Sequence, residues 1–335
     1  EMCIRDRFQS CLVLIEDELN ITAVRQIDQS EATEKNRLKS NHRPFFQSYF
    51  YRTALSKEQK LEADSSLANL EREILRLKQG RSGKVIGFID RDGAYRGKLP
   101  LRDTRPDEIQ AICSEFKRYG HIVLRLGSKR STPMNLDCVD FDLPFRNMSA
   151  KDKSRLDINI FQLLDACITW NTGYQEIPLM YNVPTVMLDE LYRNDKAENV
   201  IFVPARYKDC KTGNVLLVPE VMKNFGLHFQ ENQVARNTIT KIPASSELVL
   251  NVYESLFDKA TYKLNSSFHL RKLYLSCLIQ SIKSDNGKLV KVGGKLFWDF
   301  DRVIYDLTKY EYKLAEGFLQ ANQNLITQMA NRMLN

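Results

Sequence analysis

The chain has 335 residues, of which 43% are hydrophobic and 27% charged, and its formal net charge is +7. It is long enough to bury a real core, and since its longest apolar runs are only strand-sized, a membrane-spanning helix is excluded. The moderate positive excess suits an anionic small ligand or loose attraction to an acidic membrane surface, while the lack of a basic run interleaved with aromatic residues argues against nucleic acid.

The seven cysteines are an odd number and include no Cys-x-x-Cys pair. Several lie in apolar patterns, so we expect reduced thiols that act as small core residues in a cytoplasmic protein. Association with the inner membrane surface would then be peripheral. Residues 1–7 contain no apolar signal core. Their abrupt, charged start is typical of an internal fragment, and we leave them out of the fold prediction.

Residues 1–80 are expected to be a partial N-terminal region that ends in a helix. Ser56 and Gln59 have capping-box spacing, and apolar residues recur at helical intervals up to Gln79. Gly80 ends this predicted helix.

Residues 81–244 are predicted to form one domain in which strands and helices alternate. The segment Gly83–Tyr95 begins as an apolar strand and continues into a charged loop. Further strands are expected near residues 121–127, 138–141, 168–171, 184–188 and 199–203, with helices over 107–119 and 154–167. This alternation indicates an α/β fold, a Rossmann-like parallel sheet flanked by helices. Such sheets bind ligands at the carboxyl ends of their strands.

Beyond the last of these strands, the sequence predicts a turn-rich loop over residues 204–214 and a helix over 218–225 that Gly226 closes. Residues 232–242 are expected to be a polar connection. A mainly helical C-terminal region is expected over residues 245–335, and two short segments within it, 288–292 and 295–300, are predicted to pair as strands.

Arg91 and Asp92 follow the first strand, with Gly93 and Tyr95 beyond them. An arginine in this place can fork onto a phosphate or carboxylate, and the glycine permits close approach of a ligand. The alternative is a surface loop in which Arg91 and Asp92 pair with each other.

Arg125 lies late in an apolar strand, just before Gly127, and a charge there points to the ligand edge of the sheet. A buried ion pair is the equal alternative for Arg125. Asp157 lies in the first turn of a predicted helix, where it orients a ligand or satisfies backbone amides.

Thr172, Gly173 and Tyr174 join a strand to a helix, where backbone amides form an anion site, or else an ordinary tight turn. The chain contains neither the Gly-x-Gly-x-x-Gly fingerprint nor a Gly-Lys-Ser/Thr loop, which argues against a typical NAD enzyme or P-loop NTPase. Two Asp-x-Asp triplets, at residues 140–142 and 299–301, suit a divalent metal or a strand with one buried face. Because the four histidines are scattered, we expect no zinc site.

Several of these segments together resemble a bacterial family of glycosyltransferases linked to surface polysaccharide synthesis. The resemblance covers roughly residues 80 to 230 and is carried by Ile89-Asp-Arg-Asp-Gly-Ala-Tyr95, Tyr119-Gly-His-Ile-Val-Leu-Arg-Leu-Gly127, Leu156-Asp-Ile, Thr172-Gly173, Pro178-Leu-Met-Tyr-Asn-Val-Pro184, Ile201-Phe-Val-Pro204 and Lys211-Thr-Gly213.

The resemblance implies a GT-B-like arrangement, in which two Rossmann-like domains face each other and the second binds a nucleotide-sugar without metal or other cofactor. Asp92 would be the catalytic carboxylate. Donor-binding residues would be Arg91, Tyr95, Arg125, Gly127, Asp157, Thr172, Gly173 and Tyr174. The region before residue 80 is too short for a complete first domain, so we expect part of the acceptor side to be missing.

The resulting hypothesis is a glycosyltransferase whose partners are a nucleotide-sugar donor and a saccharide or lipid-linked acceptor. The alternative is a non-catalytic saccharide- or nucleotide-binding module in polysaccharide assembly. A weaker third option is another Rossmann enzyme such as an epimerase, against which the missing fingerprint counts.

Overall fold

The structure is a computed structural model. It describes residues 65–92, 99–127, 129–130, 132–143, 156–170, 172–190, 199–227, 229–257, 267–285, 291–292, 295–296 and 314–334. The predictions for residues 1–64, for Gly93 and Tyr95 and for the triplet at 299–301 lie outside the described residues. The predicted helix ending at Gln79 is described from Ser65 onward, as α4 (Ser65–Lys78).

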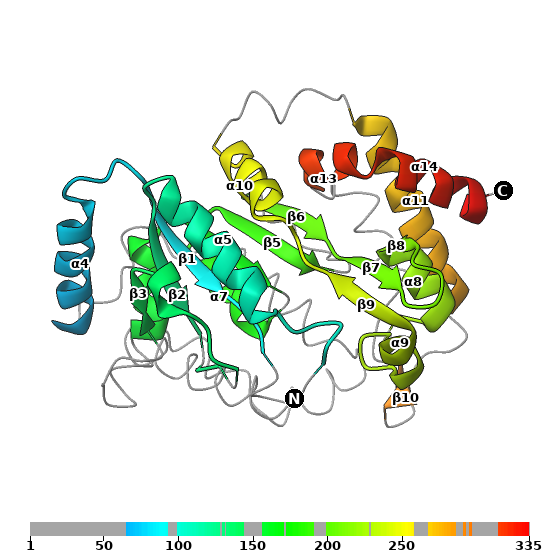
Figure 1. Cartoon of the computed structure of the whole chain (residues 1–335), viewed down its shortest axis with the longest axis horizontal. Coiled ribbons are helices and arrows are strands. Elements are labelled where there is room, and N and C mark those ends of the chain that lie inside the picture. Colours follow the sequence, from blue (N-terminus) through cyan, green and yellow to red (C-terminus); the bar gives the residue numbers. More distant parts are fainter. Residues whose placement is uncertain are drawn as a thin grey trace.

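A six-stranded parallel sheet forms the centre of the molecule, in the spatial order β3-β2-β1-β4-β5-β6 (Figure 1). Its strands are β1 (Val85–Ile89), β2 (Ile122–Leu126), β3 (Phe141–Asp142), β4 (Ala166–Trp170), β5 (Thr185–Glu190) and β6 (Val200–Pro204). From β1 the chain adds β2 and then β3 toward one edge of the sheet, and from β4 it adds β5 and β6 toward the other edge, so the strand order reverses between β1 and β4. Doubly wound sheets of this kind bind ligands where the order reverses, outside the carboxyl ends of the strands. The predicted Rossmann-like sheet is thus confirmed.

Side chains of the strands alternate between two cores, one on each face of the sheet. On β1, Val85 and Ile89 belong to one buried cluster, while Ile86 and Phe88 belong to the other. All five positions of β1 are buried because helices cover both faces. The first face carries α4, η4 (Ile160–Leu163) and α7 (Glu176–Met180), and the second carries α5 (Pro106–Arg118).

The helix predicted over residues 154–167 is shorter than expected. Residues 156–159 are helical, η4 follows, and Cys167 already belongs to β4. The chain must leave the helix early because Asp165 accepts a hydrogen bond from the amide of Val85 (2.7 Å), which fixes it at the start of the neighbouring strand.

Two segments predicted as loop or connection, 204–214 and 232–242, instead contribute to a second, antiparallel sheet of order β8-β7-β9. Its strands are β7 (Arg206–Asp209), β8 (Val215–Leu217) and β9 (Ile239–Ile242), and the helices α8 (Val218–Phe225) and α9 (Gln233–Thr238) lie between β8 and β9 in the chain. Two further 3-10 helices belong to the connections of the central sheet, η2 (Leu136–Cys138) before β3 and η5 (Gly173–Gln175) after β4. Tyr207 is fully buried and anchors β7, although its neighbours in sequence are charged. Gly226 ends α8 with φ +84°, as predicted.

The C-terminal region is mainly helical, as expected, and its helices share the core of the second sheet face. They are α10 (Ser246–Ser255), α11 (Phe268–Asp285), α13 (Glu316–Ala321) and α14 (Gln323–Leu334), and the predicted strand pair is present as β10 (Lys291–Val292) and β11 (Lys295–Leu296). The rings of Phe116 and Tyr253 join α5 to α10 at a centroid distance of 5.0 Å. Leu314 pairs with Phe202 and so covers the outer edge of β6. In the described part of the chain, no helix is both long and apolar enough to span a membrane.

The amino-terminal edge of the sheet is held partly by His121. Its Nδ1 accepts a hydrogen bond from the amide of Lys84 at 3.0 Å, and its ring packs edge-on against Tyr253. Burial and, next, the positive charge of Lys84 lower the pKa of His121. The neutral imidazole is therefore the form that the fold stabilises.

We predict that the protein loses stability on acidification through His121. A base whose folded pKa lies below its unfolded value, about 6.5, takes up its proton more readily when unfolded, so stability falls as the pH falls through that value. The free energy of unfolding in urea should decrease between about pH 7.5 and about pH 5.5, and it should decrease less in His121→Asn, whose Oδ1 is an acceptor that does not titrate. The exposed His269→Asn is the control. An equal pH dependence in wild type and His121→Asn would refute this role.

Candidate functional site

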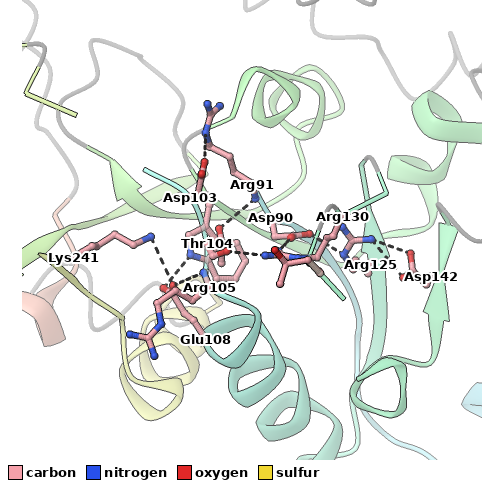
Figure 2. Close-up of polar contacts among 12 residues, drawn as sticks. Asp90, Arg91, Asp103, Thr104, Arg105, Glu108, Arg125, Arg130, Asp142 and Lys241 are labelled. Carbon is pink, nitrogen blue, oxygen red and sulfur yellow. Dashed lines mark hydrogen bonds and ion pairs between the residues drawn. The ribbon is translucent and has the colours of Figure 1, made fainter. Parts of the chain in front are cut away.

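Two arginines and two aspartates meet at the carboxyl ends of β1, β2 and β3 (Figure 2). We call Asp90, Arg125, Arg130 and Asp142 the Arg125 cluster. Arg125 Nε lies 2.9 Å from Asp90 Oδ1, and its Nη1 lies 3.2 Å from Asp142 Oδ1. Arg130 contacts the second oxygen of Asp90. All four side chains are at most 5% exposed, so the cluster is a buried, charge-balanced group.

Strand register explains how the cluster forms. Arg125 pairs with Phe88 of β1 on one side and with Asp142 of β3 on the other. Its side chain reaches the residue after β1, which is Asp90. The buried ion pair, one of the two roles predicted for Arg125, is therefore present in the structure. A contact from Arg125 to a donor phosphate stays a prediction.

The loop that follows β1 is closed at its base by contacts that we call the Arg91 neck, formed by Arg91, Asp103 and Thr104. The amide of Thr104 donates to the carbonyl of Arg91 at 2.7 Å, and the amide of Arg91 donates to Thr104 Oγ1 at 3.2 Å. Arg130 Nη2 donates to the carbonyl of Thr104 at 2.7 Å. The neck is thereby fastened to the Arg125 cluster.

The side chain of Arg91 is directed by Asp103. Arg91 Nε lies 3.3 Å from Asp103 Oδ1, and Asp103 Oδ2 accepts a hydrogen bond from the amide of Leu99 at 2.7 Å. Figure 2 shows the outer end of the guanidinium pointing away from Asp103. Within the described residues, Asp103 and Thr104 supply the polar contacts of Arg91. Burial raises the pKa of Asp103, and the Leu99 amide and the charge of Arg91 oppose this effect.

A second buried group, the Lys241 cluster, lies at the carboxyl ends of β4 and β5 and consists of Glu108, Trp170, Asp189 and Lys241. Lys241 Nζ is 2.6 Å from Asp189 Oδ2 and 3.7 Å from Glu108 Oε2. Trp170 Nε1 donates to Glu108 Oε1 at 3.2 Å. Burial opposes the charge on Lys241, but the carboxylates of Asp189 and Glu108 outweigh it and raise the pKa of Lys241. Burial and the charge of Asp189 raise the pKa of Glu108.

Asp189 has a strained backbone, with φ +58°, and the register of β5 against β6 shifts between Leu188 and Glu190. Asp tolerates this left-handed conformation better than most residues. The irregularity turns the carboxylate of Asp189 toward Lys241, which stabilises it.

The first turn of α5 is occupied by acids of the chain itself. Asp107 and Glu108 lie there, and Glu108 Oε2 is 3.5 Å from the amide of Arg105, which donates to it. In dinucleotide-binding proteins the helix after the first strand places its N-terminus on the pyrophosphate. Here carboxylates already compensate that helix dipole. This agrees with the missing glycine fingerprint.

The residues predicted after β4 form a compact turn. Thr172 Oγ1 accepts from the amide of Tyr174 at 3.0 Å, and the amide of Thr172 donates to Gln175 Oε1 at 3.2 Å. The hydroxyl of Tyr174 donates to the carbonyl of Asp157, which brings these two predicted residues together. The amides of Thr172 and Tyr174 thus donate hydrogen bonds within the turn itself. An anion site at this turn stays a prediction. The donor contacts of Asp157 and Tyr174 also stay predictions.

Gly127 follows β2 with φ +95°, a conformation that favours glycine. Asp92 lies at the carboxyl end of β1 and is half-buried. Of the predicted triplet, Asp140 Oδ1 lies 2.9 Å from Arg81 Nη1 while its Oδ2 accepts from the amide of Val123 (2.9 Å), and Asp142 faces Arg125. In the described residues, both of these carboxylates therefore have basic partners.

Sequence reasoning missed most of the two clusters, namely Asp90, Glu108, Arg130, Asp189 and Lys241, and it also missed Asp103 of the Arg91 neck. The burial of Lys241 could have been predicted from strand alternation, which places Lys241 on the same face of β9 as the buried Ile239. In the structure Lys241 also pairs with the buried Tyr207 of β7. No sequence pattern places Asp103 or Arg130, which lie in irregular segments.

Comparisons of the chain with protein families, with curated proteins and with solved structures find no match. The geometry of the site and the sequence resemblance are thus the grounds for a function.

We predict that removing the charge of Arg125 destabilises the fold. Arg125→Met keeps an aliphatic side chain but leaves Asp90 and Asp142 buried with less positive charge, which should cost about 3–5 kcal/mol of unfolding free energy. Arg118→Met is the control, because Arg118 forms an exposed pair with Glu115 on α5 and should leave the unfolding midpoint nearly unchanged. Urea denaturation measures both. Similar midpoints for the two variants would contradict a structural role of the Arg125 cluster.

Proposed function

We propose that the chain is the nucleotide-sugar-binding half of a GT-B-type glycosyltransferase. The reaction transfers a sugar from a nucleotide diphosphate to a saccharide or lipid-linked acceptor in surface polysaccharide synthesis. The observation that carries the proposal is the position of Arg91, at the carboxyl end of β1 and beside β4, where the strand order reverses. The sequence resemblance supports the same assignment.

The charges at this edge favour Arg91 as the group that meets an anion. Arg125 and Arg130 face carboxylates inside the Arg125 cluster, and Lys241 lies between Asp189 and Glu108. The outer end of the Arg91 guanidinium points out of the neck (Figure 2). A planar guanidinium recognises two phosphate oxygens at once, which suits the diphosphate of a sugar donor.

In the proposed reaction an acceptor hydroxyl forms a bond to the anomeric carbon of the donor sugar. The bond from that carbon to the diphosphate oxygen breaks, and the electron pair leaves with the nucleoside diphosphate. Arg91 stabilises the negative charge that develops on the diphosphate, as a metal does in other glycosyltransferases. Asp92 accepts the hydroxyl proton as general base.

The second candidate function is a non-catalytic nucleotide- or saccharide-binding module. It is favoured by the burial of Asp90, Asp142, Glu108 and Asp189 in ion pairs, since a buried, paired carboxylate is not placed to reach a substrate. The two functions differ in turnover. A transferase releases nucleoside diphosphate from a donor when acceptor is supplied and loses this release in Asp92→Asn, whereas a module binds the donor without releasing it.

We predict that a nucleotide or nucleotide-sugar raises the thermal unfolding midpoint of the protein, because a ligand that binds only the folded state stabilises it by mass action. A screen of UDP, GDP, ADP, CMP and their common sugar conjugates, with and without Mg²⁺, should give a selective shift that does not need the metal. Arg91→Ala should abolish this shift.

The matched control is Arg118→Ala, which removes an exposed arginine from the opposite end of α5 and should keep the shift. Two results would count against the proposal. One is the absence of a shift with every compound, and the other is an equal shift in wild type and Arg91→Ala.

A further inference from the structure

We propose that Asp103 is a positioning residue, which holds Arg91 Nε so that the two Nη atoms of the guanidinium are presented together to a diphosphate. This inference rests on the proposed function, because it concerns the same anion site. Asp103 lies in a loop, and no sequence pattern indicates a role for it.

The backbone of Arg91 is fixed from two sides. Thr104 exchanges two hydrogen bonds with it, one through the Thr104 amide and one through the Thr104 hydroxyl. The carbonyl of Thr104 is held by Arg130, which in turn contacts Asp90. The Cα atom of Arg91 therefore has a defined place relative to the sheet, and the direction of its side chain is what remains to be set.

Asp103 sets that direction. Its Oδ2 is fixed by the amide of Leu99 at 2.7 Å, which leaves Oδ1 facing Arg91 Nε at 3.3 Å. The two side chains are only 11% and 15% exposed. A guanidinium anchored through Nε keeps Nη1 and Nη2 side by side for a bidentate contact. Such preorganisation reduces the entropy that ligand binding costs.

The ion pair between Arg91 and Asp103 lacks a well-formed hydrogen bond in the structure. Arg91 Nε and Asp103 Oδ1 are both buried, and in the described part of the chain neither makes a hydrogen bond of good geometry, although they form an ion pair. Buried polar atoms without a well-formed hydrogen bond are uncommon in folded proteins and need an explanation. Hydrogen bonds at functional sites often tighten only when the ligand is bound. A diphosphate on the Nη atoms would draw the guanidinium into place and align Nε with Asp103.

Acidification supplies a second means of testing the role of Asp103. The charged groups that act on its carboxyl are Arg91 after β1 and Lys241 on β9, and burial is the largest influence and raises the pKa of Asp103. Asp103 thus takes up a proton at a higher pH than an ordinary aspartate does. Protonation of Asp103 would weaken its ion pair with Arg91. As the pH is lowered, diphosphate affinity should therefore decrease more steeply in wild type than in Asp103→Asn.

The test is a double-mutant cycle measured by calorimetric titration with inorganic pyrophosphate and with UDP, on wild type, Asp103→Asn, Arg91→Ala and the double variant. We expect Asp103→Asn to weaken binding of both ligands by about fivefold to tenfold, the loss of part of one charge-assisted contact. In the Arg91→Ala background, Asp103→Asn should have no further effect. Asp107→Asn, an exposed acid paired with Arg105, is the matched control and should bind like wild type.

The outcomes separate this inference from the proposed function. Unchanged affinity in Asp103→Asn, or an equal loss in the presence and absence of Arg91, overturns the positioning role and leaves the proposed function standing. Failure of wild-type protein to bind either ligand overturns the positioning role, and the proposed function is overturned as well only if no nucleotide or nucleotide-sugar of the thermal screen binds. If Asp103→Asn does not fold, Asp103→Glu replaces it in the cycle, because it keeps the charge but moves the carboxylate away from its place between Leu99 and Arg91.

Discussion

The carboxyl edge of this sheet depends on one buried carboxylate, that of Asp90, which is shared by Arg125 and Arg130. Charges in a protein interior are tolerated only with close partners, so each of these groups restricts the others. Through Arg125 the carboxylate links β1 to β2, and through Arg130 it fastens the carbonyl of Thr104. The Arg91 neck is therefore positioned by the same interaction that joins the strands.

The Lys241 cluster has a complementary role on the other side of the point where the strand order reverses. It joins the first turn of α5 to the ends of β4 and β5 and to β9 of the second sheet. Two rigid, internally paired groups thus flank Arg91. The charges of these groups are largely compensated, and Arg91, although paired with Asp103 through Nε, would meet an approaching anion with the outer end of its guanidinium. This is the physical reason why we propose that a donor diphosphate binds there.

Sequence patterns predicted the parallel sheet, the helix α5 and the helical C-terminal region because these depend on local periodicity and on Pro, Gly and charge at helix ends. They failed where pairing with distant segments decides the structure. Tyr207 and its charged neighbours form a strand only because β8 and β9 lie on both sides of it. The predicted helix over 154–167 ended early because Asp165 bonds to Val85 of another strand.

The same distinction holds at the site. Arg91 and Arg125 could be selected because a charge near the end of an apolar strand is unusual. Their partners could not, because Asp103 and Asp90 become neighbours of these arginines only through the loop closure and the strand register. The sequence left two roles open for Arg125. The ion pair could not be chosen in advance, because it requires Asp142 of β3, which is distant from Arg125 in sequence.

The central claim is that a nucleotide-sugar binds at the carboxyl ends of β1 and β4. The most direct measurement is amide hydrogen exchange, followed by mass spectrometry, with and without the nucleotide-sugar that stabilises the protein most. Our account predicts slower exchange in peptides that cover residues 85–92, 99–105 and 172–175, and unchanged exchange in the second sheet. Protection of β7, β8 and β9 with no change at the ends of β1 and β4 would contradict it.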